Sequence, residues 1–490
     1  MNTSIIRYIL GHVLRIEALL LLLPCLIAVY FHESQGWYYL FTAALCVVLG
    51  MLMTWKKPKS SIFYLKEGCI ATAMSWIFLS VFGCLPFCIS GEIPSFTNAL
   101  FETISGFTTT GASILEDVEA LSHCALFWRS FTHWIGGMGV LVFLLAIIPM
   151  SGGSNINLMR AESPGPSVGK LVPKIGATAR ILYGIYFGLT LLQLLLLYLN
   201  GMPLFDAVTT SIGTAGTGGF GIRGDSIAGY SDTLQWIVTV FMILFGINFN
   251  FYYYLLFRQF RKALGMQEVR AYLLIILASV GFITLNIRHL TGGLFRALTQ
   301  AAFQVASIIT TTGFATTDFN QWPEASKTIL VMLMFVGACA GSTGGGIKVS
   351  RFLISIQSVL SELHSYIHPK AITTVKMDKK PIDREVVRAT NVYFITFLLI
   401  FATSVFVISL EGHDLITNFT AVAATINNIG PGLSQVGPAA NFNFFSHFSK
   451  YVLMFDMLAG RLELFPLLIL LHPTVWKDML SQRRPKKLDR

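Results

Sequence analysis

The sequence is poor in charge and lacks the residue patterns by which soluble enzymes are usually recognised. Only 12% of its 490 residues are Asp, Glu, Lys or Arg, whereas roughly 25% is usual for a soluble protein. Its seven cysteines form no CxxC pair and have no histidine at ligand spacing, so they indicate neither a zinc site nor a redox centre. No nucleophile, base and orienting residue can be grouped either. We therefore do not expect an enzyme.

Nucleotide-binding patterns are also missing. No GxGxxG loop occurs within a βαβ pattern. The glycine-rich stretch "GACAGSTGGGIK" (residues 337–348) lacks the GxxxxGK[ST] spacing, because Lys348 follows Ile347. The chain is expected to bind no nucleotide, so nucleotide-dependent regulation would have to come from another chain.

Hydrophobic residues make up 54% of the chain and gather in long runs. A helix needs around 20 residues to cross a hydrocarbon core of about 30 Å, and about ten runs qualify as candidates. They lie at residues 5–30, 37–53, 69–88, 127–148, 181–199, 234–257, 272–287, 393–410, 451–471 and, interrupted by glycines, 328–360. The first run is too long for a cleaved signal peptide, and a second run follows at once. These runs predict an all-α, multi-pass membrane protein.

The net charge of +10 is distributed unevenly along the chain. With a cytoplasmic N-terminus, most of the 35 Lys and Arg fall on the inner side of the predicted spans, as the positive-inside rule requires. Basic clusters lie at residues 56–59, 160–180, 258–262, 370–388 and 483–487. The pattern predicts cytoplasmic N- and C-termini and a basic face that meets anionic membrane lipid. It does not favour a nucleic-acid partner.

"FTTTGAS" at residues 107–113 returns as "ITTTGFA" at residues 309–315, which points to an internal repeat. In four places, an apolar run too short to cross the membrane ends in a glycine-containing stretch between two spans. The expected units are residues 1–66 (two extra N-terminal helices), 67–180 (repeat 1, pore loop near 97–113), 181–270 (repeat 2, pore loop near 204–221), 271–388 (repeat 3, pore loop near 295–314, broken second helix 328–360) and 389–490 (repeat 4, pore loop near 414–433, and a basic tail).

Short segments of this kind are informative, because non-helical backbone at membrane depth is tolerated only where protein buries it or it lines a wet cavity. Four short helices that return as extended strands can aim carbonyl oxygens at one axis and replace the hydration shell of a monovalent cation. Glycine permits positive φ, and threonine adds an oxygen or braces the strand. Glycine that serves helix packing alone is the alternative. The fold expected is two N-terminal helices plus four helix–pore-loop–helix repeats around a central pore.

Six motifs carry a resemblance to a known family. They are "TTTGAS" (108–113), "GTGGFG" (216–221), "TTTGF" (310–314), "GACAGSTGGGIKVSR" (337–351), "NNIGPGL" (427–433) and "GRLELF" (460–465). Together they resemble the TrkH/TrkG-type membrane subunits of the Trk/Ktr/HKT superfamily of potassium transporters. The resemblance implies potassium uptake across the bacterial cytoplasmic (inner) membrane by a homodimer with one pore per subunit. It also implies a cytosolic, nucleotide-binding regulatory subunit of the TrkA type on the basic face.

The resemblance also implies a selectivity filter in which potassium is the bound substrate. Its residues are Thr109, Thr110 and Gly111; Thr217 with Gly218 or Gly219; Thr311, Thr312 and Gly313; and Asn428, Ile429 and Gly430. In the second loop Gly218 is preferred to Gly219, and in the fourth Gly430 is preferred to Gly432. Two of the loops depart from Thr-Thr-Gly, so the ring is not strictly fourfold. Appreciable sodium permeation is therefore left open.

The glycine-rich stretch 337–348 begins near mid-bilayer by helix rise. Its small residues abolish helix propensity there, which predicts a loop that blocks or opens the pathway, with a passive kink as the alternative. The resemblance favours the gate. The gate residues are Gly341, Ser342, Thr343, Gly344, Gly345, Gly346 and Lys348.

Arg461 lies within the last predicted span, where an arginine is costly unless it faces a cavity or a partner. We expect it to contact the loop around residues 341–346 and to repel cations from the closed pathway. A structural pair with Glu463 or Asp456 is disfavoured by their placement on the helix.

These observations predict potassium uptake through a channel-like, gated pore driven by the membrane potential. The alternative is a symporter that couples potassium to protons or sodium. Such proteins place ionisable residues in broken helices at the midplane, and we find no clear interior Asp or Glu at the level of the glycine-rich stretch.

Overall fold

The computed structural model describes residues 2–58, 64–139, 175–370, 373–378 and 380–481. Within these ranges the structure is helical apart from loops and one short antiparallel strand pair. That pair joins β1 (Lys376–Met377) to β2 (Lys380–Pro381), with Lys376 opposite Pro381. The predicted all-α fold is confirmed.

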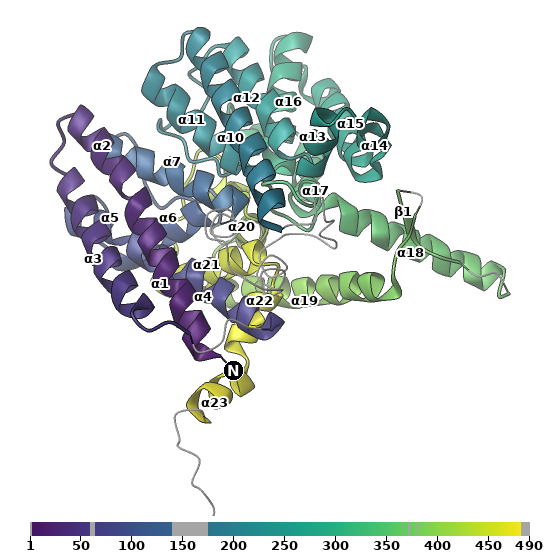
Figure 1. Ribbon diagram of the computed structural model, residues 1–490. Coiled ribbons are helices and arrows are strands. Elements are labelled where there is room, and N and C mark those ends of the chain that lie inside the picture. The colour runs from purple at the N-terminus through teal and green to yellow at the C-terminus, as the bar shows by residue number, and fades with distance from the viewer. Residues whose placement is uncertain (1, 59–63, 140–174, 371–372, 379, 482–490) are drawn as a thin grey trace, which may run out of the picture.

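Three helices form the N-terminal flank of the molecule, drawn in purple in Figure 1: α1 (Thr3–Leu20), α2 (Leu22–Tyr30) and α3 (Gly36–Thr54). The helix α3 packs against both α1 and α2. Small residues make this contact close, because a Cβ added at Gly50 would lie 2.8 Å from the carbonyl oxygen of Gly11. The flank then packs on the first repeat through α1 and α4.

Four repeats follow, each with a long helix, a short helix, a loop and a second helix. Repeat 1 comprises α4 (Leu65–Gly83), α5 (Leu85–Ser90), α6 (Phe96–Phe107) and α7 (His123–Met138); repeat 2 comprises α10 (Ile175–Leu199), α11 (Leu204–Gly216), α12 (Asp232–Phe245), α13 (Phe249–Leu256) and α14 (Phe260–Gly265). Repeat 3 comprises α15 (Gln267–Ile287), α16 (Leu294–Ile309), η1 (Phe319–Gln321), α17 (Glu324–Val336) and α18 (Val349–Ile367); repeat 4 comprises α19 (Arg384–Ser409), α20 (Leu415–Ile426), η2 (Ser434–Val436), α21 (His447–Arg461), α22 (Phe465–Leu471) and α23 (Pro473–Ser481).

The short helices α6, α11, α16 and α20 have 12, 13, 16 and 12 residues. At 1.5 Å per residue they reach about 18–24 Å, which is too short to cross a core of about 30 Å. Their C-terminal halves are almost entirely buried, although they contain several polar residues. The chain must therefore turn back inside the protein at the end of each short helix.

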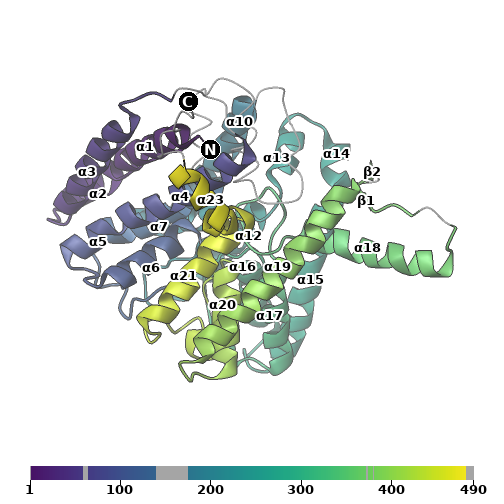
Figure 2. The same cartoon turned by 90° about the horizontal axis from the view of Figure 1, so that it is seen from below.

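The short helices and the second helices pack into a closed cycle. The order of contacts is α6–α7–α11–α12–α16–α17–α20–α21 and back to α6. Each short helix thus lies between the second helix of its own repeat and that of the preceding repeat. Figure 2 shows α6, α7, α12, α16, α20 and α21 grouped in the middle of the molecule, with α18 projecting from its side.

Helix length separates the first helices of the repeats from the second. By length and apolarity, six continuous spans among the described residues can cross a membrane: Thr3–Tyr30, Gly36–Thr54, Leu65–Ser90, Arg180–Leu199, Gln267–Ile287 and Arg384–Ser409. A seventh is the pair α12 and α13, which is bent by 91°.

Two runs expected to be continuous are broken. Residues 234–257 bend between α12 and α13, and residues 451–471 are interrupted after Arg461, where Glu463 and Leu464 have positive φ. The run 328–360 is broken as expected, between α17 and α18. Part of the run 127–148 lies outside the described residues. Breaks in second helices therefore occur in several repeats, whereas the sequence indicated one.

Candidate functional site

The four short helices end in loops with the same backbone. We name them loop 1 (residues 108–113), loop 2 (217–221), loop 3 (310–315) and loop 4 (427–433). Each loop has one non-glycine residue in the left-handed region: Thr109, Thr217, Thr311 and Asn428, with φ of 56°, 53°, 58° and 56°. Two residues later each has a glycine with positive φ: Gly111, Gly219, Gly313 and Gly430, with φ of 78°, 74°, 85° and 98°. The backbone of the repeat is therefore shared even where the side chains differ.

Hydrogen bonds fix this shape at the end of each short helix. The N–H groups of Thr110, Gly218, Thr312 and Ile429 each donate to the carbonyl five residues earlier, over 2.8, 3.0, 2.8 and 2.8 Å. This is the bond of a Schellman motif, in which the left-handed position usually holds glycine. Three loops instead hold threonine, whose β-branched side chain makes positive φ unusual and costs about 1–2 kcal/mol. Such strain clusters at functional sites.

The glycines close the loops into a ring. A Cβ added at Gly111 would lie 2.1 Å from the carbonyl oxygen of Gly218, and one at Gly219 would lie 2.0 Å from that of Thr312. One at Gly313 would lie 2.1 Å from that of Ile429, and one at Gly430 would lie 2.8 Å from that of Thr110. Each glycine thus faces a carbonyl of the next loop, in the order 1–2–3–4–1. The glycines do serve close packing, but between loops at the centre.

This ring also gives the register of the loops. In loop 2 it is Gly219, not the preferred Gly218, that corresponds to Gly111 and Gly313, and Gly218 takes the place held by Thr110 in loop 1. The sequence could not separate the two glycines because they are adjacent. In loop 4 the corresponding residue is Gly430, whereas Gly432 packs on Thr420 of its own repeat.

Side-chain hydrogen bonds brace loops 1, 3 and 4. Thr110 and Thr312 share hydrogen bonds with the hydroxyls of Thr108 and Thr310, at 2.8 and 2.7 Å, which braces loops 1 and 3 internally. In loop 4, Asn428 Nδ2 donates to Thr110 Oγ1 at 3.0 Å and to Met457 O at 2.9 Å, which ties loop 4 to loop 1.

The hydroxyls at the left-handed positions differ from one another. Thr109 Oγ1 is buried and has no partner among the described residues. Thr217 Oγ1 donates to Gly216 O at 2.7 Å, and Thr311 Oγ1 accepts the N–H of Gly345 at 2.6 Å. Among the described residues, the hydroxyls of Thr217 and Thr311 are therefore hydrogen-bonded, whereas that of Thr109 is not.

Beyond the ring lies one open cavity that all four loops share. Gly111, Gly219, Gly313 and Gly430 all line it. Its wall also includes Glu116 and the two arginines Arg129 and Arg223. Every ring glycine therefore opens onto the same space.

The segment 337–348 lies directly against loops 3 and 4. Gly345 donates to Thr311 Oγ1, and the N–H of Gly346 donates to Asn427 O at 3.0 Å. A Cβ added at Gly344 would lie 2.9 Å from Thr310 O. The non-helical segment expected from the sequence is present, and its backbone touches the bases of two loops.

The rest of this segment is held from several sides. Thr343 N and Oγ1 donate to Phe245 O, at 3.4 and 3.2 Å, and the N–H of Phe249 donates to Gly341 O at 2.9 Å. Ser342 Oγ donates to Cys339 O at 2.7 Å. Lys348 is buried, has φ of 86°, and donates to the carbonyls of Gly345, at 3.0 Å, and Gly344.

Arg461 contacts this segment, as expected. Its Nη1 donates to Thr343 O at 3.0 Å, and its Nη2 donates to Gly137 O at 2.9 Å and to Gly136 O. It therefore bridges the segment of repeat 3 to the end of α7 in repeat 1. Glu463 instead pairs with Arg351, and Asp456 accepts from Ser404 Oγ at 2.8 Å.

Sequence reasoning missed several buried ionisable residues. Glu268 at the start of α15 accepts the N–H groups of Ala340, at 2.7 Å, and Ser350, at 3.2 Å. A carboxylate therefore does lie at the level of the segment, contrary to our expectation. Glu102 and Arg129, on α6 and α7, form an ion pair of 2.7 Å behind loops 1 and 2. Glu102 and Arg129 are each a single charged residue within an apolar stretch of sequence. A charged residue in such a stretch indicates a buried partner, and this signal could have revealed the pair.

Apolar helices around a buried ring of loops define a multi-pass membrane protein with a pseudo-fourfold centre. The chain belongs to the TrkH family: residues 39–483 match its family model, described as cation transport protein. TrkH of Vibrio parahaemolyticus, a Trk system potassium uptake protein, is 37% identical over 491 residues, covering 97% of this chain and 99% of the relative. The TrkH protein of Salmonella typhimurium is 36% identical over 467 residues, covering 94% and 96%.

A solved structure agrees with these matches. The crystal structure of the potassium transporter TrkH from Vibrio parahaemolyticus has a TM-score of 0.86 and 33% identity to this chain, covering 97% of this chain and 100% of that chain. The family resemblance noted in the sequence is confirmed.

Gly313→Ser should alter cation flux, because the new side chain would meet Ile429 O and displace loop 4. The matched control is Gly412→Ser. Gly412 has a φ of 84°, close to the 85° of Gly313, so the backbone strain is the same, but a Cβ added at Gly412 would have no atom within 4 Å. Both changes should cost about 1–2 kcal/mol of stability from φ alone. Cation flux into liposomes and thermal unfolding in detergent separate the two effects. Equal flux in both variants would contradict the ring.

Gly218→Ala should be destabilising by about 1–3 kcal/mol through overpacking, since its Cβ would lie 2.0 Å from Cγ of the buried His133 ring. Adding His133→Ala should recover part of this loss, so the two changes are non-additive. Gly281→Ala, with nothing within 4 Å, should instead add to His133→Ala. Thermal unfolding of the five variants tests the pair, and simple additivity for Gly218 would exclude this packing.

Proposed function

We propose that this chain carries potassium across the bacterial cytoplasmic membrane through the ring of loops 1–4. The observation that carries the proposal is the cyclic glycine–carbonyl contact, which sets four non-helical strands around one axis in a bundle of apolar helices. The names of its relatives as potassium uptake proteins support the choice of ion.

Unpaired carbonyls give the ring its chemistry. No hydrogen bond from the described residues reaches the carbonyl oxygens of residues 109–111, 217–219, 311–313 or 428–430. Buried carbonyls normally find a partner. Neutral oxygens arranged around an axis can replace the water around a monovalent cation. The filter then consists of the carbonyls of these residues, with Thr109 Oγ1 as an additional oxygen.

The segment 337–348 acts as the gate in this proposal. It touches Thr311 and Asn427 at the base of the loops, so it lies on the route that an ion takes after the ring. Arg461 places a positive charge on the same route and holds Thr343. Lys348 anchors the segment, because its ammonium group donates to the carbonyl of Gly345 within the same segment. Movement of the segment opens the pathway.

The proposal includes the assembly implied by the sequence resemblance. Both termini are cytoplasmic, as the basic clusters indicate. The unit is a homodimer, and a cytosolic TrkA-type subunit that binds nucleotide regulates it from the basic face. The projecting helix α18 begins directly after the gate segment, so a force applied to α18 reaches the gate through continuous backbone.

A second candidate function is ion-coupled symport. Glu268 favours it, because this carboxylate binds the gate segment through Ala340. Loss or gain of a proton there would change the position of the segment. A dependence of potassium uptake on an imposed pH gradient, removed by Glu268→Gln, identifies this mechanism.

Cation flux into liposomes that contain this protein alone tests the main proposal. Potassium should enter down the electrical gradient and sodium should enter more slowly, because rings of backbone carbonyls of this kind replace the hydration shell of potassium in potassium-selective filters. Empty liposomes and liposomes with Gly313→Ser serve as controls. Absence of electrogenic cation flux under every gradient would reject the proposal.

Arg461→Ala should raise basal flux severalfold, because it frees Thr343 and removes a positive charge from the pathway. Arg461→Lys should lie between wild type and alanine, since an ammonium keeps the charge but cannot span Thr343, Gly136 and Gly137 together. Arg296→Ala, at an exposed position on α16, is the control and should leave flux unchanged. Equal flux in all four proteins would show that Arg461 has no part in gating.

A further inference from the structure

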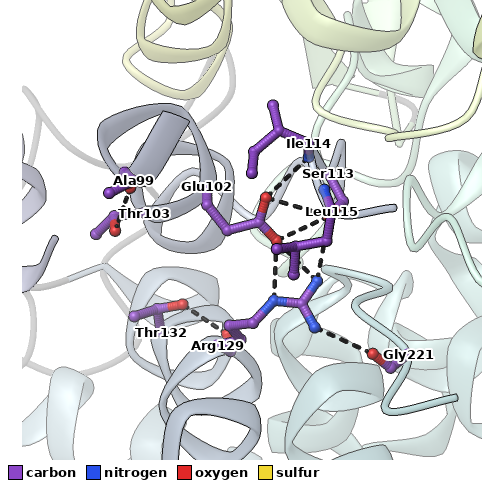
Figure 3. A network of polar contacts seen from close by, with 9 residues as sticks. All are labelled: Ala99, Glu102, Thr103, Ser113, Ile114, Leu115, Arg129, Thr132 and Gly221. Carbon is purple, nitrogen blue, oxygen red and sulfur yellow. Dashed lines mark hydrogen bonds and ion pairs between the residues drawn. The ribbon is translucent and has the colours of Figure 1, made fainter. Parts of the chain in front are cut away.

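The ion pair of Glu102 and Arg129 lies behind loops 1 and 2 and is almost completely buried, with 1% and 2% of each residue exposed. Arg129 binds the carboxylate through two nitrogens, Nη2 at 2.7 Å and Nε at 2.9 Å. Figure 3 shows the guanidinium placed between the carboxylate and the backbone of loop 2 at Gly221. Neither residue belongs to the ring itself.

Glu102 holds loop 1, whereas Arg129 holds loop 2 and also donates from Nη2 to Ser113 Oγ of loop 1 at 3.4 Å. Glu102 accepts from Ser113 Oγ at 2.9 Å and from the N–H of Ile114 at 3.0 Å, at the outer end of loop 1. Arg129 donates through Nη1 to Gly221 O at 3.2 Å, at the outer end of loop 2. Its guanidinium also lies 4.2 Å from the centre of the Phe220 ring. The pair therefore connects loop 1 to loop 2.

Comparison of the four loops shows why loop 2 needs outside support. Loops 1 and 3 are braced by their own hydroxyl pairs, and loop 4 is braced by Asn428. Repeat 2 has glycine at both corresponding positions, Gly216 at the end of α11 and Gly218 in loop 2, so no hydroxyl pair can form. Gly219 and Gly221 are two further residues without a Cβ, so the backbone of loop 2 has little restraint from its own side chains.

The face of α7 supplies the missing support. Arg129 and His133 are one turn apart, and Phe220 packs on both, with 4.3 Å between the centres of the Phe220 and His133 rings. His133 also fills the space that a side chain at Gly218 would occupy. Arg129 can be held in this position only if its charge is neutralised, and Glu102 provides that.

The outer ends of the other neighbouring loops are joined differently. Ile227 N–H donates to Ala315 O at 3.1 Å between repeats 2 and 3, and Phe442 N–H donates to Ser113 O at 2.8 Å between repeats 4 and 1. Ser434 N–H donates to Asn320 Oδ1 at 2.9 Å between repeats 3 and 4. Between repeats 1 and 2, an exposed contact of 3.1 Å from Gly224 N–H to Glu119 accompanies the buried pair. Among the described residues, this is the only one of the four junctions between outer loop ends that contains a buried ion pair.

We propose that Glu102 and Arg129 are positioning residues that fix the backbone of loop 2 in the ring and thereby set the preference for potassium over sodium. The inference rests on the proposed function for its effect on selectivity. Its structural part, the ordering of loop 2, is independent of that function.

The test compares two variants of the full-length protein. The double variant Glu102→Gln/Arg129→Gln removes both charges together, which avoids leaving one charge buried and unpaired. Arg129→Lys keeps the charge beside Glu102 but loses the planar fork that reaches Gly221 and covers Phe220. Glu17→Gln removes a carboxyl group that is fully buried in α1, and it serves as the control.

Hydrogen exchange of the backbone amides in loops 1 to 3 is measured first. Arg129→Lys should speed exchange more in loop 2 than in loop 1, whose outer end stays bound to Glu102 through the N–H of Ile114, and the double variant should speed it in both loops. Loop 3 should not change in either variant, nor any loop in Glu17→Gln. Unchanged exchange in loop 2, or equal acceleration in loop 3, overturns the positioning role.

Potassium and sodium flux is then measured in the same preparations. Both variants should keep cation flux while the potassium-to-sodium ratio falls severalfold toward one. An unchanged ratio with a loosened loop 2 overturns the role in selectivity. If the wild-type protein carries no cation, the proposed function fails, and hydrogen exchange still decides whether the pair orders loop 2.

Discussion

The central constraint of this structure is that non-helical backbone inside a membrane has to be buried in protein or line a wet cavity. The four loops meet it by touching one another. Each ring glycine packs against a carbonyl oxygen of the next loop. That oxygen lies 2.0 to 2.8 Å from the ideal Cβ position of the glycine, which is too close for any residue with a Cβ. The cycle of short and second helices exists to bring these four glycines together, since each short helix delivers its loop to the same centre.

The same backbone is reached by four unequal sequences. Loops 1 and 3 use hydroxyl pairs, loop 4 uses an asparagine, and loop 2 uses an arginine and a histidine from α7. The left-handed residue at the helix end is common to all, although threonine adopts it at a cost. Symmetry of the backbone is thus maintained by asymmetric side chains. In the function proposed above, an ion in the ring would meet similar carbonyls braced by different side chains.

Much of this was visible in the sequence. Apolar runs and the repeated Thr-Thr-Gly indicated the helical class, the repeats and the position of the loops, because each depends on local composition. The register of loop 2 could not be read, since Gly218 and Gly219 differ only in which neighbour each one faces. The buried pair of Glu102 and Arg129 was missed for a similar reason. These residues are 27 positions apart, and their contact depends on how α6 and α7 pack.

The contact between Gly345 and Thr311 joins the ring to the segment beneath it. Thr311 is one of the strained residues, with φ of 58°, and its hydroxyl accepts the N–H of Gly345 at 2.6 Å. Gly346 binds Asn427, which precedes the strained residue of loop 4. A movement of the segment therefore removes a hydrogen bond from a residue whose backbone is already unfavourable. In the function proposed above, opening of the pathway and relaxation of loop 3 would then be coupled events, and the selectivity proposed for the ring would depend on the position of this segment.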